Sequence, residues 1–539
     1  MNSAQSRREF AVAAAFLALL TLLVGVPGSA SLPLDMHEIY VVQSVREMAA
    51  RGDWILPYMN GEPRLNKPPL NYWLTGAFAW LSGDLPRAAE WHARAVSIAG
   101  GIGMVLATVA LGAMLYGRAV ALLGGLLLAT SVGLFGSMHD GRPDMLYAAL
   151  CMAALAALAW SAQRAARDEG TWAPALLMWL AVALATLSKG PHMPALVLAG
   201  GVIHLWREGR SWREIGRIVR PLAGLALVLA LCAPWWVALQ MRLGEARLAA
   251  SQLGGELLVP KLSRLGNPYF LYRPLELLLP WLPLAVLALA PGFAWQRRDW
   301  GWLLWPLAVS VAGLSLAPQY RLVYILPLLG VLALALAHAL APLLARAAAP
   351  ARLAAGALTL QLALALGFLG YAVYRARDAV SVPALVLAVS LTLVAAARLF
   401  AWSRRRGWVQ AGAIGAAALV VAASWPLGVA GRAWWSAERF EARALALRAG
   451  ERLPRDVPLA VLDVNPTMYV YYAERRVREL PGEPALAAAL AGAPGGRLGL
   501  VTRAAHLRGL APRFAFEEIA RFARAGDDDV LVLVTARRP

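Results

Sequence analysis

Residues 31–74 read SLPLDMHEIYVVQSVREMAARGDWILPYMNGEPRLNKPPLNYWL, and this stretch decides how the rest of the chain is interpreted. It is polar, with Asp35 and Glu38 near its start, and it lies between two strongly apolar segments near residues 10–29 and 93–116. An apolar run of about 20 residues spans the hydrocarbon core of a bilayer. We therefore interpret residues 31–74 as part of a long loop that leaves a membrane before the chain returns to it.

The composition places most of the chain in lipid. Of its 539 residues, 60% are hydrophobic and 15% are charged, and the mean hydropathy is +0.57. A typical soluble protein is about 45–50% apolar and about 25% charged. The formal net charge of +19 would indicate nucleic-acid binding in a soluble protein, but here Arg residues in cytoplasmic loops account for it. We expect a polytopic α-helical membrane protein and no nucleic-acid partner.

Apolar runs long enough to span a bilayer occur about thirteen times. The first follows Arg7 and Arg8 and resembles a signal peptide, but it is long enough to span, so we interpret it as an uncleaved helix; a cleaved signal is the alternative. Cys151 and Cys232 lie inside apolar runs and are interpreted as small buried residues. The predicted spans are residues 10–29, 93–116, 119–137, 145–161, 173–188, 191–206, 221–240, 274–295, 301–317, 322–341, 353–373, 382–400 and 409–430.

The basic residues of the loops predict the orientation. If the N-terminus is cytoplasmic, the cytoplasmic segments hold roughly 18 Lys and Arg residues and the short outer loops roughly 5. An odd number of spans then places the tail outside. We predict a transmembrane domain over residues 1–431, with long outer loops at 30–92 and 241–273, and an outer domain over 432–539.

The tail differs in character from the apolar helices. The runs VPLAVLDV, RLGLVTRA and DDVLVLVTA predict strands, whereas EPALAAALAGA and APRFAFEEIARFARAG are interpreted as helices. Together they predict a small α/β domain without a glycine-rich phosphate loop. In the first outer loop, HEIYVVQSVREMAARG predicts an amphipathic helix on the membrane surface, and NYWLTGAFAWLSG and the pair Trp434-Trp435 suit the membrane interface.

Two carboxylates at the outer ends of spans are candidate functional groups, because ionisable groups at membrane depth are costly unless they are paired or hydrated. Asp35 follows the first span, and Asp144 opens the fourth, with Arg142 just before it. Each can be catalytic or can orient a substrate; each can instead be a helix N-cap, with Arg142 as the surface partner of Asp144. Asp140 lies further out and is expected to be solvated.

Three cations lie at the same outer level. Lys67 is held on the stiff turn NKPPL, Lys189 on LSKGPHM, and Arg321 starts the span in PQYRLVYILPLL. Lys67 can instead reach lipid phosphates, and Arg321 can be a snorkelling anchor. Acids beside cations at the lipid boundary suit a substrate with a phosphate and a polar head on a lipid tail. The outer His residues lack metal-ligand spacing on one helix, so a metal site is a weak prediction.

These residues lie in ordered stretches that resemble a known family. LDMHEIYVVQSVREMAARGDWILPYMNGEPRLNKPPLNYWLTG, GRPDMLYAAL, LATLSKGP and PQYRLVYILPLLGVLALALA resemble the bacterial aminoarabinose transferases of lipid A. More broadly, they resemble the protein O-mannosyltransferase-like integral membrane glycosyltransferases of the GT-C type. The resemblance covers residues 31 to about 340, and about thirteen spans with an outer α/β tail match the layout of the aminoarabinose transferases.

The resemblance implies a sugar donor on undecaprenyl phosphate, used at the periplasmic face of the bacterial inner membrane, and lipid A or another glycolipid as acceptor. The essential acids of the family correspond to Asp35 and Asp144, and the lysines of its two conserved turns correspond to Lys67 and Lys189. The other residues that we expect to bind the donor phosphate or the substrate are Arg321, Tyr320, Tyr324, Arg142 and Glu38.

Departures from the family pattern affect the metal and the substrates. Asn66 stands where Glu usually precedes KPP, Arg64-Leu65 replace an aromatic pair, and Arg321 replaces a common Lys. Arg binds phosphate well through its planar fork, so the role of residue 321 survives the change. Some members bind a metal near the KPP turn, so a divalent metal is possible but no cofactor is certain. The exact sugar and acceptor stay open.

The predicted mechanism is single displacement with inversion at the anomeric carbon. Lys67, Lys189 and Arg321 would offset the charge of the leaving phosphate. Asp35 would be the general base for a hydroxyl acceptor, or would orient the sugar if the acceptor is a lipid A phosphate. Asp144 would position the donor or order the first outer loop. The alternatives are a transferase that acts on protein or another polysaccharide, and a transporter or flippase, against which the nearly uncharged mid-span stretches argue.

Overall fold

The computed structural model describes residues 3–244, 269–288, 300–317, 320–341, 351–432, 437–522 and 531–537. The chain divides into two compact units. We call them the helical unit (Met1–Ala30, Leu65–Leu74 and Trp91–Trp434) and the mixed unit (Ser31–Arg64, Thr75–Glu90 and Trp435–Pro539). Most of the first outer loop therefore lies in the same compact unit as the tail.

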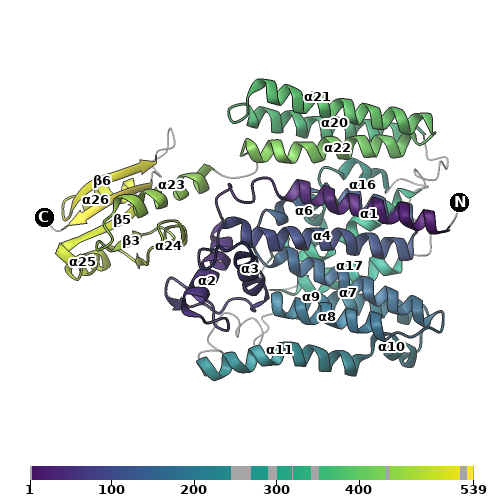
Figure 1. The fold of residues 1–539 in the computed structure, drawn as a ribbon, viewed down its shortest axis with the longest axis horizontal. Coiled ribbons are helices and arrows are strands. Elements are labelled where there is room, and N and C mark those ends of the chain that lie inside the picture. The colour runs from purple at the N-terminus through teal and green to yellow at the C-terminus, as the bar shows by residue number, and fades with distance from the viewer. Residues whose placement is uncertain are drawn as a thin grey trace. The chain divides into compact units, whose positions relative to one another are not determined.

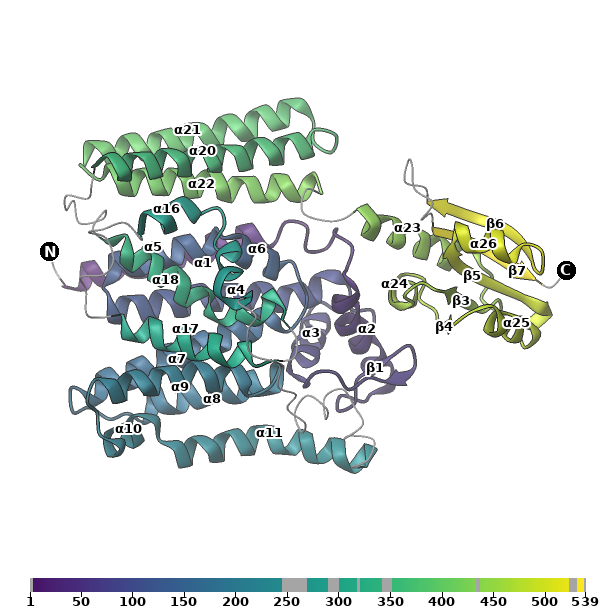
Figure 2. The same ribbon diagram turned by 180° about the vertical axis from the view of Figure 1, so that it is seen from behind.

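The helical unit is a bundle of apolar helices (Figures 1 and 2). In the part of the chain that the structure describes, eight helices are long and apolar enough to span a membrane, or nine if the bent pair α5–α6 is one span. The predicted count of about thirteen is not confirmed. Its elements are α1 (Ser3–Gly25), α4 (Glu90–Leu115), α5 (Arg118–Ala129), α6 (Val132–Met138), α7 (Asp144–Ala165), α8 (Trp172–Ser188), α9 (His192–Arg207), α10 (Trp212–Val219), α11 (Pro221–Leu243), α14 (Tyr269–Tyr272), α15 (Pro274–Leu277), α16 (Leu282–Ala288), α17 (Gly301–Ser315), η1 (Leu322–Leu328), α18 (Leu329–Ala339), α20 (Ala351–Ala376), α21 (Val382–Arg405) and α22 (Val409–Ala430).

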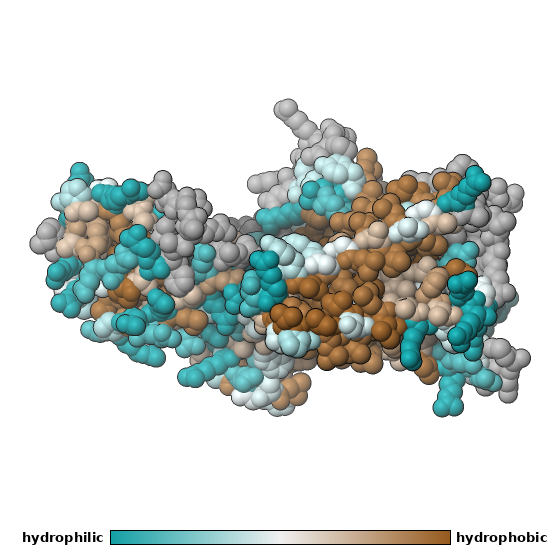
Figure 3. All heavy atoms as spheres, turned by 90° about the horizontal axis from the view of Figure 1, so that it is seen from above, coloured by the Kyte–Doolittle hydropathy of each residue, from teal (hydrophilic) through white to brown (hydrophobic). Residues whose placement is uncertain are grey.

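Apolar side chains remain exposed on the outside of this bundle, as expected for a surface that faces lipid. Figure 3 shows them over much of the visible face of the helical unit. Phe16, Leu222 and Leu387 are 61%, 84% and 60% exposed. Exposed apolar surface of this extent is rare on soluble monomers. With the spanning helices, it makes the chain a multi-pass membrane protein.

One predicted span is bent in the structure, and another begins as a 3₁₀ helix. The span 119–137 is α5 and α6, bent by 56°. The hydroxyl of Ser131 accepts a hydrogen bond from the backbone N–H of Leu134 and so caps a new helix after α5. The span 322–341 begins as the 3₁₀ helix η1, which contains Pro327, a residue without an N–H for the helical ladder. Hydropathy does not reveal these two irregularities, because the residues on both sides of each one are apolar.

Several predictions fall wholly or partly outside the described residues. Most of the predicted outer loop 241–273 does so, as do residues 289–295 of the predicted span 274–295. The described residues 274–288 of that span contain two short helices, α15 and α16. The pair Trp434-Trp435 also lies outside the described residues.

The tail is an α/β fold, as predicted. Its five-stranded sheet has the order β4-β3-β5-β7-β6, in which β3 pairs in parallel with β4 and β5, and β7 pairs antiparallel with β5 and β6. Leu486, Leu500 and Val532 are fully buried in its core. The elements of the tail are α23 (Ala437–Arg452), β3 (Leu459–Leu462), α24 (Thr467–Tyr472), β4 (Val477–Leu480), α25 (Glu483–Ala491), η2 (Pro494–Gly496), β5 (Arg497–Arg503), α26 (Ala504–Leu510), β6 (Ala515–Phe522) and β7 (Leu531–Arg537).

One prediction for the tail is wrong. The run APRFAFEEIARFARAG, predicted as a helix, contains the edge strand β6. Its Glu, Ala and Arg residues favour helix locally, but pairing with β7 overrides that preference. An irregularity in register between Glu518 and Ala520 also disturbs the alternation that would have indicated a strand.

The first outer loop contains α2 (Met36–Arg51), the hairpin β1–β2 (Tyr58–Met59 and Glu62–Pro63) and α3 (Leu70–Leu81). Both helices are confirmed. The apolar face of α2 is fully buried, for example at Val42 and Met48, so it is covered by protein and does not lie open on a membrane surface. Trp80 at the end of α3 is 70% exposed, as an interfacial residue would be.

Candidate functional site

A buried ion pair joins α7 to the end of α8. Asp144 is the first residue of α7, and Lys189 follows the last residue of α8. The Lys189 Nζ donates to Asp144 Oδ1 at 2.5 Å, and the two side chains are only 9% and 12% exposed. A carboxylate at a helix N-terminus and a cation at a helix C-terminus are both favoured by the helix dipoles. The turns GRPDMLY and LSKGPHM, chosen from the sequence separately, therefore meet.

Arg142 is the second cation beside Asp144. Its Nε lies 3.6 Å from Asp144 Oδ2 and donates to Asp140 Oδ2 at 2.6 Å. The hydroxyl of Ser97 in α4 donates to the backbone carbonyl of Asp140 at 2.7 Å and holds this turn in place. Asp140, expected to be solvated, is instead paired and only 26% exposed. The turn thus places a fixed cation, Arg142, beside Asp144 and leads directly into α7.

Two tyrosines line the pair. The Nζ of Lys189 lies 4.9 Å from the ring centroid of Tyr324 and 5.7 Å from that of Tyr147. The Tyr147 hydroxyl donates to the carbonyl of Gly190 at 2.9 Å and accepts from the N–H of Met193 at 3.0 Å, which fixes the turn that carries Lys189. Tyr147 was not predicted, although it stands three residues after Asp144 and so lies on the same face of α7.

Lys67 is part of the same electrostatic environment. It belongs to the helical unit and acts on both Asp144 and His192 by Coulomb interaction. Arg142 and Lys189 therefore lie against one carboxylate, and the charge of Lys67 also acts on it. We call Lys67, Arg142, Asp144, Lys189 and Tyr324 the Asp144 cluster.

The predicted residues of the PQYR turn are placed differently. Arg321 is exposed and stands just before η1, one turn from Tyr324. The ring of Tyr320 packs on Phe270, with centroids 5.7 Å apart, and on Tyr269 at 6.0 Å. Tyr324 thus joins the Asp144 cluster, whereas Tyr320 belongs to an aromatic group with α14.

Asp35 and Glu38 begin α2 in the mixed unit. Asp35 Oδ1 accepts from the N–H of His37, and Glu38 Oε2 accepts from the N–H of Asp35, both at 2.7 Å. This capping box confirms the N-cap alternative for Asp35. The second oxygen, Oδ2, accepts from Arg439 Nη2 of α23 at 2.7 Å, with side chains 30% and 35% exposed. Sequence reasoning could not find Arg439, which lies about 400 residues away.

Asp35 and Asp144 lie in different compact units, so their shared pocket stays a prediction. Within the described ranges, no three His, Cys, Asp or Glu side chains are grouped so that they could hold a metal ion. The chemistry that the geometry does provide is electrostatic: a fixed, partly buried set of cations around a carboxylate in the helical unit, and a capped, arginine-paired carboxylate in the mixed unit.

Comparisons with known proteins agree with these features. A family model described as dolichyl-phosphate-mannose-protein mannosyltransferase matches residues 66–237, a range that includes Lys67, Asp144 and Lys189. An undecaprenyl phosphate-alpha-4-amino-4-deoxy-L-arabinose arabinosyl transferase from Aeromonas hydrophila is 28% identical over 346 residues. That match covers 57% of each chain, so this chain aligns with little more than half of the curated relative.

A crystal structure of ArnT from Cupriavidus metallidurans bound to undecaprenyl phosphate has a TM-score of 0.71 and 19% identity, and the likeness covers 99% of this chain and 98% of that one. The apo structure of the same protein also has a TM-score of 0.71. The chain has the fold of ArnT. The GT-C fold class expected from the sequence is therefore confirmed, as is the resemblance to the aminoarabinose transferases.

Proposed function

We propose that this chain is a glycosyltransferase that transfers 4-amino-4-deoxy-L-arabinose from undecaprenyl phosphate to lipid A at the periplasmic face of the bacterial inner membrane. The observation that carries the proposal is the match to the Aeromonas arabinosyl transferase, whose name states the donor and the sugar. The ArnT structure bound to undecaprenyl phosphate supports the lipid carrier. The arrangement of charge in the Asp144 cluster supports the chemistry.

The leaving group of this reaction is a phosphate, and the cluster offers the cations to stabilise it. Fixed charges in a partly dry site stabilise developing negative charge more strongly than the same charges in water. Lys189 is almost buried, and the positive charge of Lys67 acts on Asp144, the partner of Lys189. Arg321, exposed one turn before Tyr324, is the third cation that we assign to the donor phosphate.

Asp144 has a positioning role in this proposal. Its carboxylate holds one proton of the Lys189 ammonium and so fixes the direction of the other two. A phosphate that binds Lys189 would use those remaining donors and would not displace the carboxylate. Arg142 offsets the negative charge of Asp144, so the carboxylate does not repel the donor.

Asp35 acts on the acceptor side. If the acceptor atom is a hydroxyl, Asp35 accepts its proton as general base; if it is an ionised phosphate of lipid A, Asp35 orients the sugar or its amine. One carboxylate on the acceptor side implies a single displacement with inversion at the anomeric carbon. Since one Asp35 oxygen caps α2, the oxygen that contacts Arg439 is the one available to the substrate.

A second candidate is transfer to protein or to another polysaccharide. The matching family model is described by a protein mannosyltransferase activity, which favours this alternative. The same cations would serve any polyprenyl-phosphate sugar, so the two candidates differ only at the acceptor.

The test is an assay with the purified full-length chain, undecaprenyl-phosphate aminoarabinose and lipid A. A gain in lipid A mass of one aminopentose supports the proposal, and the anomeric configuration of the product tests inversion. The double variant Asp144→Asn/Lys189→Met, which leaves neither charge of the buried pair without its partner, serves as the inactive control. If the wild-type protein leaves lipid A unchanged but glycosylates a protein or polysaccharide acceptor, the second candidate replaces the first.

A further inference from the structure

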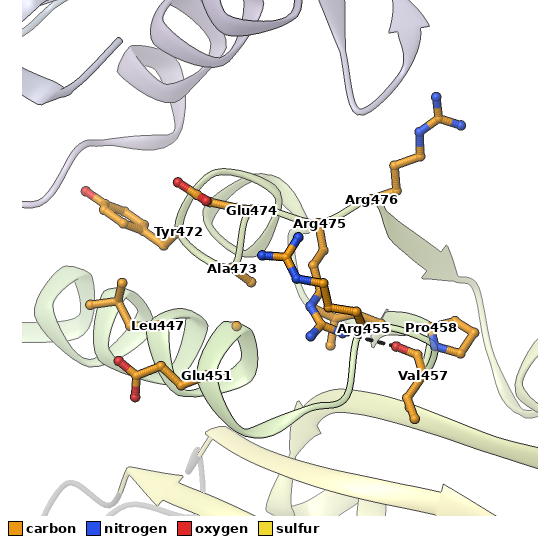
Figure 4. A pocket seen from close by; sticks show the side chains of 12 residues that line it. Leu447, Glu451, Arg455, Val457, Pro458, Tyr472, Ala473, Glu474, Arg475 and Arg476 are labelled. Atoms are coloured by element: carbon orange, nitrogen blue, oxygen red, sulfur yellow. Dashed lines mark hydrogen bonds between the residues drawn. The ribbon is translucent and has the colours of Figure 1, made fainter. Parts of the chain in front are cut away.

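The mixed unit contains a second concentration of positive charge, distinct from the candidate site. Two adjacent hollows share the turn Glu474–Arg476. The larger, of about 570 Å³, lies between α23, the start of β3 and this turn (Figure 4). The smaller, of about 510 Å³, lies between the same turn, α2 and the end of the first outer loop. We call the two together the arginine cleft. Its charged lining residues are Arg46, Arg51, Arg87, Arg455, Arg475, Arg476, Glu47, Glu451 and Glu474.

Arg475 is the fixed centre of the cleft. Its guanidinium donates to the backbone carbonyls of Leu453, Pro454 and Val457, and none of these acceptors carries a charge. Burial and the positive charge of Arg455 lower the pKa of Arg475, and Asp456 opposes this effect. Folding therefore holds two like charges close together, and an anion bound beside them would stabilise both.

The other arginines differ in whether they already have a partner. Arg46 donates to the carbonyl of Ala88, stacks on Tyr471 and lies 3.7 Å from Glu474. Arg87, Arg455 and Arg476 are exposed, and none of them forms an ion pair with another residue of the described ranges. These exposed side chains can turn toward a ligand at little cost, whereas Arg46 and Arg475 are fixed.

The charge in the larger hollow is polarised. Figure 4 shows Glu451 and Glu474 at one side and Arg455 and Arg475 at the other. Arginine binds phosphate through a planar fork of N–H donors, and carboxylates accept hydrogen bonds from sugar hydroxyls. A cavity of a few hundred Å³ with a few well-placed polar groups is typical of a small-ligand site. A phosphorylated sugar has both of the groups that this hollow can bind.

We propose that the arginine cleft binds the phosphorylated sugar head group of the acidic glycolipid acceptor, with the phosphate at Arg455 and Arg475 and the sugar hydroxyls at Glu451 and Glu474. This inference rests on the proposed function, because it assigns the acceptor end of that reaction to the mixed unit. A glycolipid with two phosphates would bind one of them in the larger hollow and leave the other free to act as the acceptor.

The test uses the full-length protein in lipid nanodiscs that contain no lipopolysaccharide. Binding of lipid A and of enzymatically dephosphorylated lipid A is measured for the wild type, for the double variant Arg455→Gln/Arg476→Gln, and for Arg478→Gln. Arg478 is the matched control, since it is exposed on β4, directly after the turn, and lines neither hollow. Arg475 is left intact because its hydrogen bonds to three carbonyls support the fold.

The wild type and Arg478→Gln should prefer the phosphorylated lipid by roughly tenfold or more, as expected for charge-assisted hydrogen bonds. The double variant should lose this preference and show a KM for lipid A that is raised roughly tenfold, with kcat and the KM for the donor unchanged. Equal binding of the two lipids by the wild type, or wild-type behaviour of the double variant, overturns the inference. So does complete competition by millimolar inorganic phosphate, which would identify a site for the free anion.

Failure of this inference is separable from failure of the proposed function. If the wild type prefers phosphorylated lipid A, the double variant loses this preference, and the wild type never transfers an aminopentose, the cleft is supported and the transferase is refuted. Transfer by the double variant with an unchanged KM keeps the transferase and refutes the cleft.

Discussion

At the scale of single residues, the pairing of Lys189 with Asp144 limits what each side chain can do. A buried cation that loses its partner is strongly destabilising, by about 3–5 kcal/mol, whereas replacing both partners with neutral residues is often tolerated. Catalysis and stability therefore respond differently to substitutions in this pair.

We expect Asp144→Asn to lower both the thermal stability of the detergent-solubilised protein and its transfer activity, because Lys189 is then buried without its carboxylate. The double variant Asp144→Asn/Lys189→Met should recover much of the stability while its activity stays lost. Apparent Tm and initial transfer rates measure the two effects. Asp140→Asn is the control, since Asp140 contacts Arg142 without reaching Lys189. A double variant as active as the wild type would remove Lys189 from the phosphate-binding set.

The two oxygens of Asp35 separate a structural role from a chemical one. Asn caps helices as well as Asp does, whereas Ala at an N-cap costs about 1 kcal/mol. Asp35→Asn keeps the cap and loses only the partly exposed ion pair with Arg439, so we expect it to lower stability by at most about 1 kcal/mol and to lose transfer. We expect Asp35→Ala to lose more stability, because the cap goes as well, and also to lose transfer. The measurements are thermal unfolding and an assay in membranes. Full transfer activity in Asp35→Asn would reduce Asp35 to a helix cap.

Much of the candidate site was predictable from the sequence, because ionisable residues at membrane depth are rare and Asp144, Lys189 and Lys67 each stand out. Their pairing followed only once α7 and α8 were in place. Tyr147 was not predicted as a site residue, because a tyrosine in an apolar helix has the pattern of a core residue. Arg439 could not be predicted, since no local pattern links residues so far apart in the chain.

At the scale of elements, close helix packing depends on small residues. In α9, a Cβ at Gly200 would lie 2.4 Å from the Cα of Pro306 in α17, and backbone atoms cannot move away cheaply. In α20, a Cβ at Gly356 would meet nothing within 4 Å. Small residues at contact points let membrane helices approach closely.

We expect Gly200→Ala to lower the apparent Tm by forcing α9 away from α17, at a cost of about 1–3 kcal/mol for overpacking. The matched variant Gly356→Ala should be neutral or stabilising by about 0.5–1 kcal/mol, since Ala favours helix over Gly. Thermal unfolding of both variants in the same detergent is the measurement. Equal Tm values would contradict the packing of these helices.

The predictability of elements follows the same physics. Hydropathy located most membrane helices because lipid demands long apolar runs, and Val-rich runs located β3, β5 and β7. It missed the break after α5, which depends on one hydroxyl cap at Ser131. It also assigned β6 as a helix, because the strand exists through its pairing with β7 and not through its own sequence.

At the scale of the whole molecule, the orientation in the membrane is the remaining prediction. The charge bias of the loops places the N-terminus in the cytoplasm and the tail in the periplasm. The proposed reaction requires this orientation, because its donor and acceptor are both used in the periplasm. Two positions lie on the same side of the membrane if an even number of spans separates them, and on opposite sides if the number is odd.

Single cysteines introduced into a Cys151→Ala/Cys232→Ala background can test this parity with a membrane-impermeant maleimide. Gly170→Cys lies in the loop between α7 and α8, and Asp378→Cys lies between α20 and α21. Arg508→Cys lies in the α/β tail. We expect the reagent to label residues 378 and 508 in cells with a permeabilised outer membrane, and residue 170 only after the inner membrane is disrupted. Labelling of residues 170 and 378 from the same side would require an even number of crossings between them, and it would contradict the charge-based topology and the periplasmic placement of the active site together.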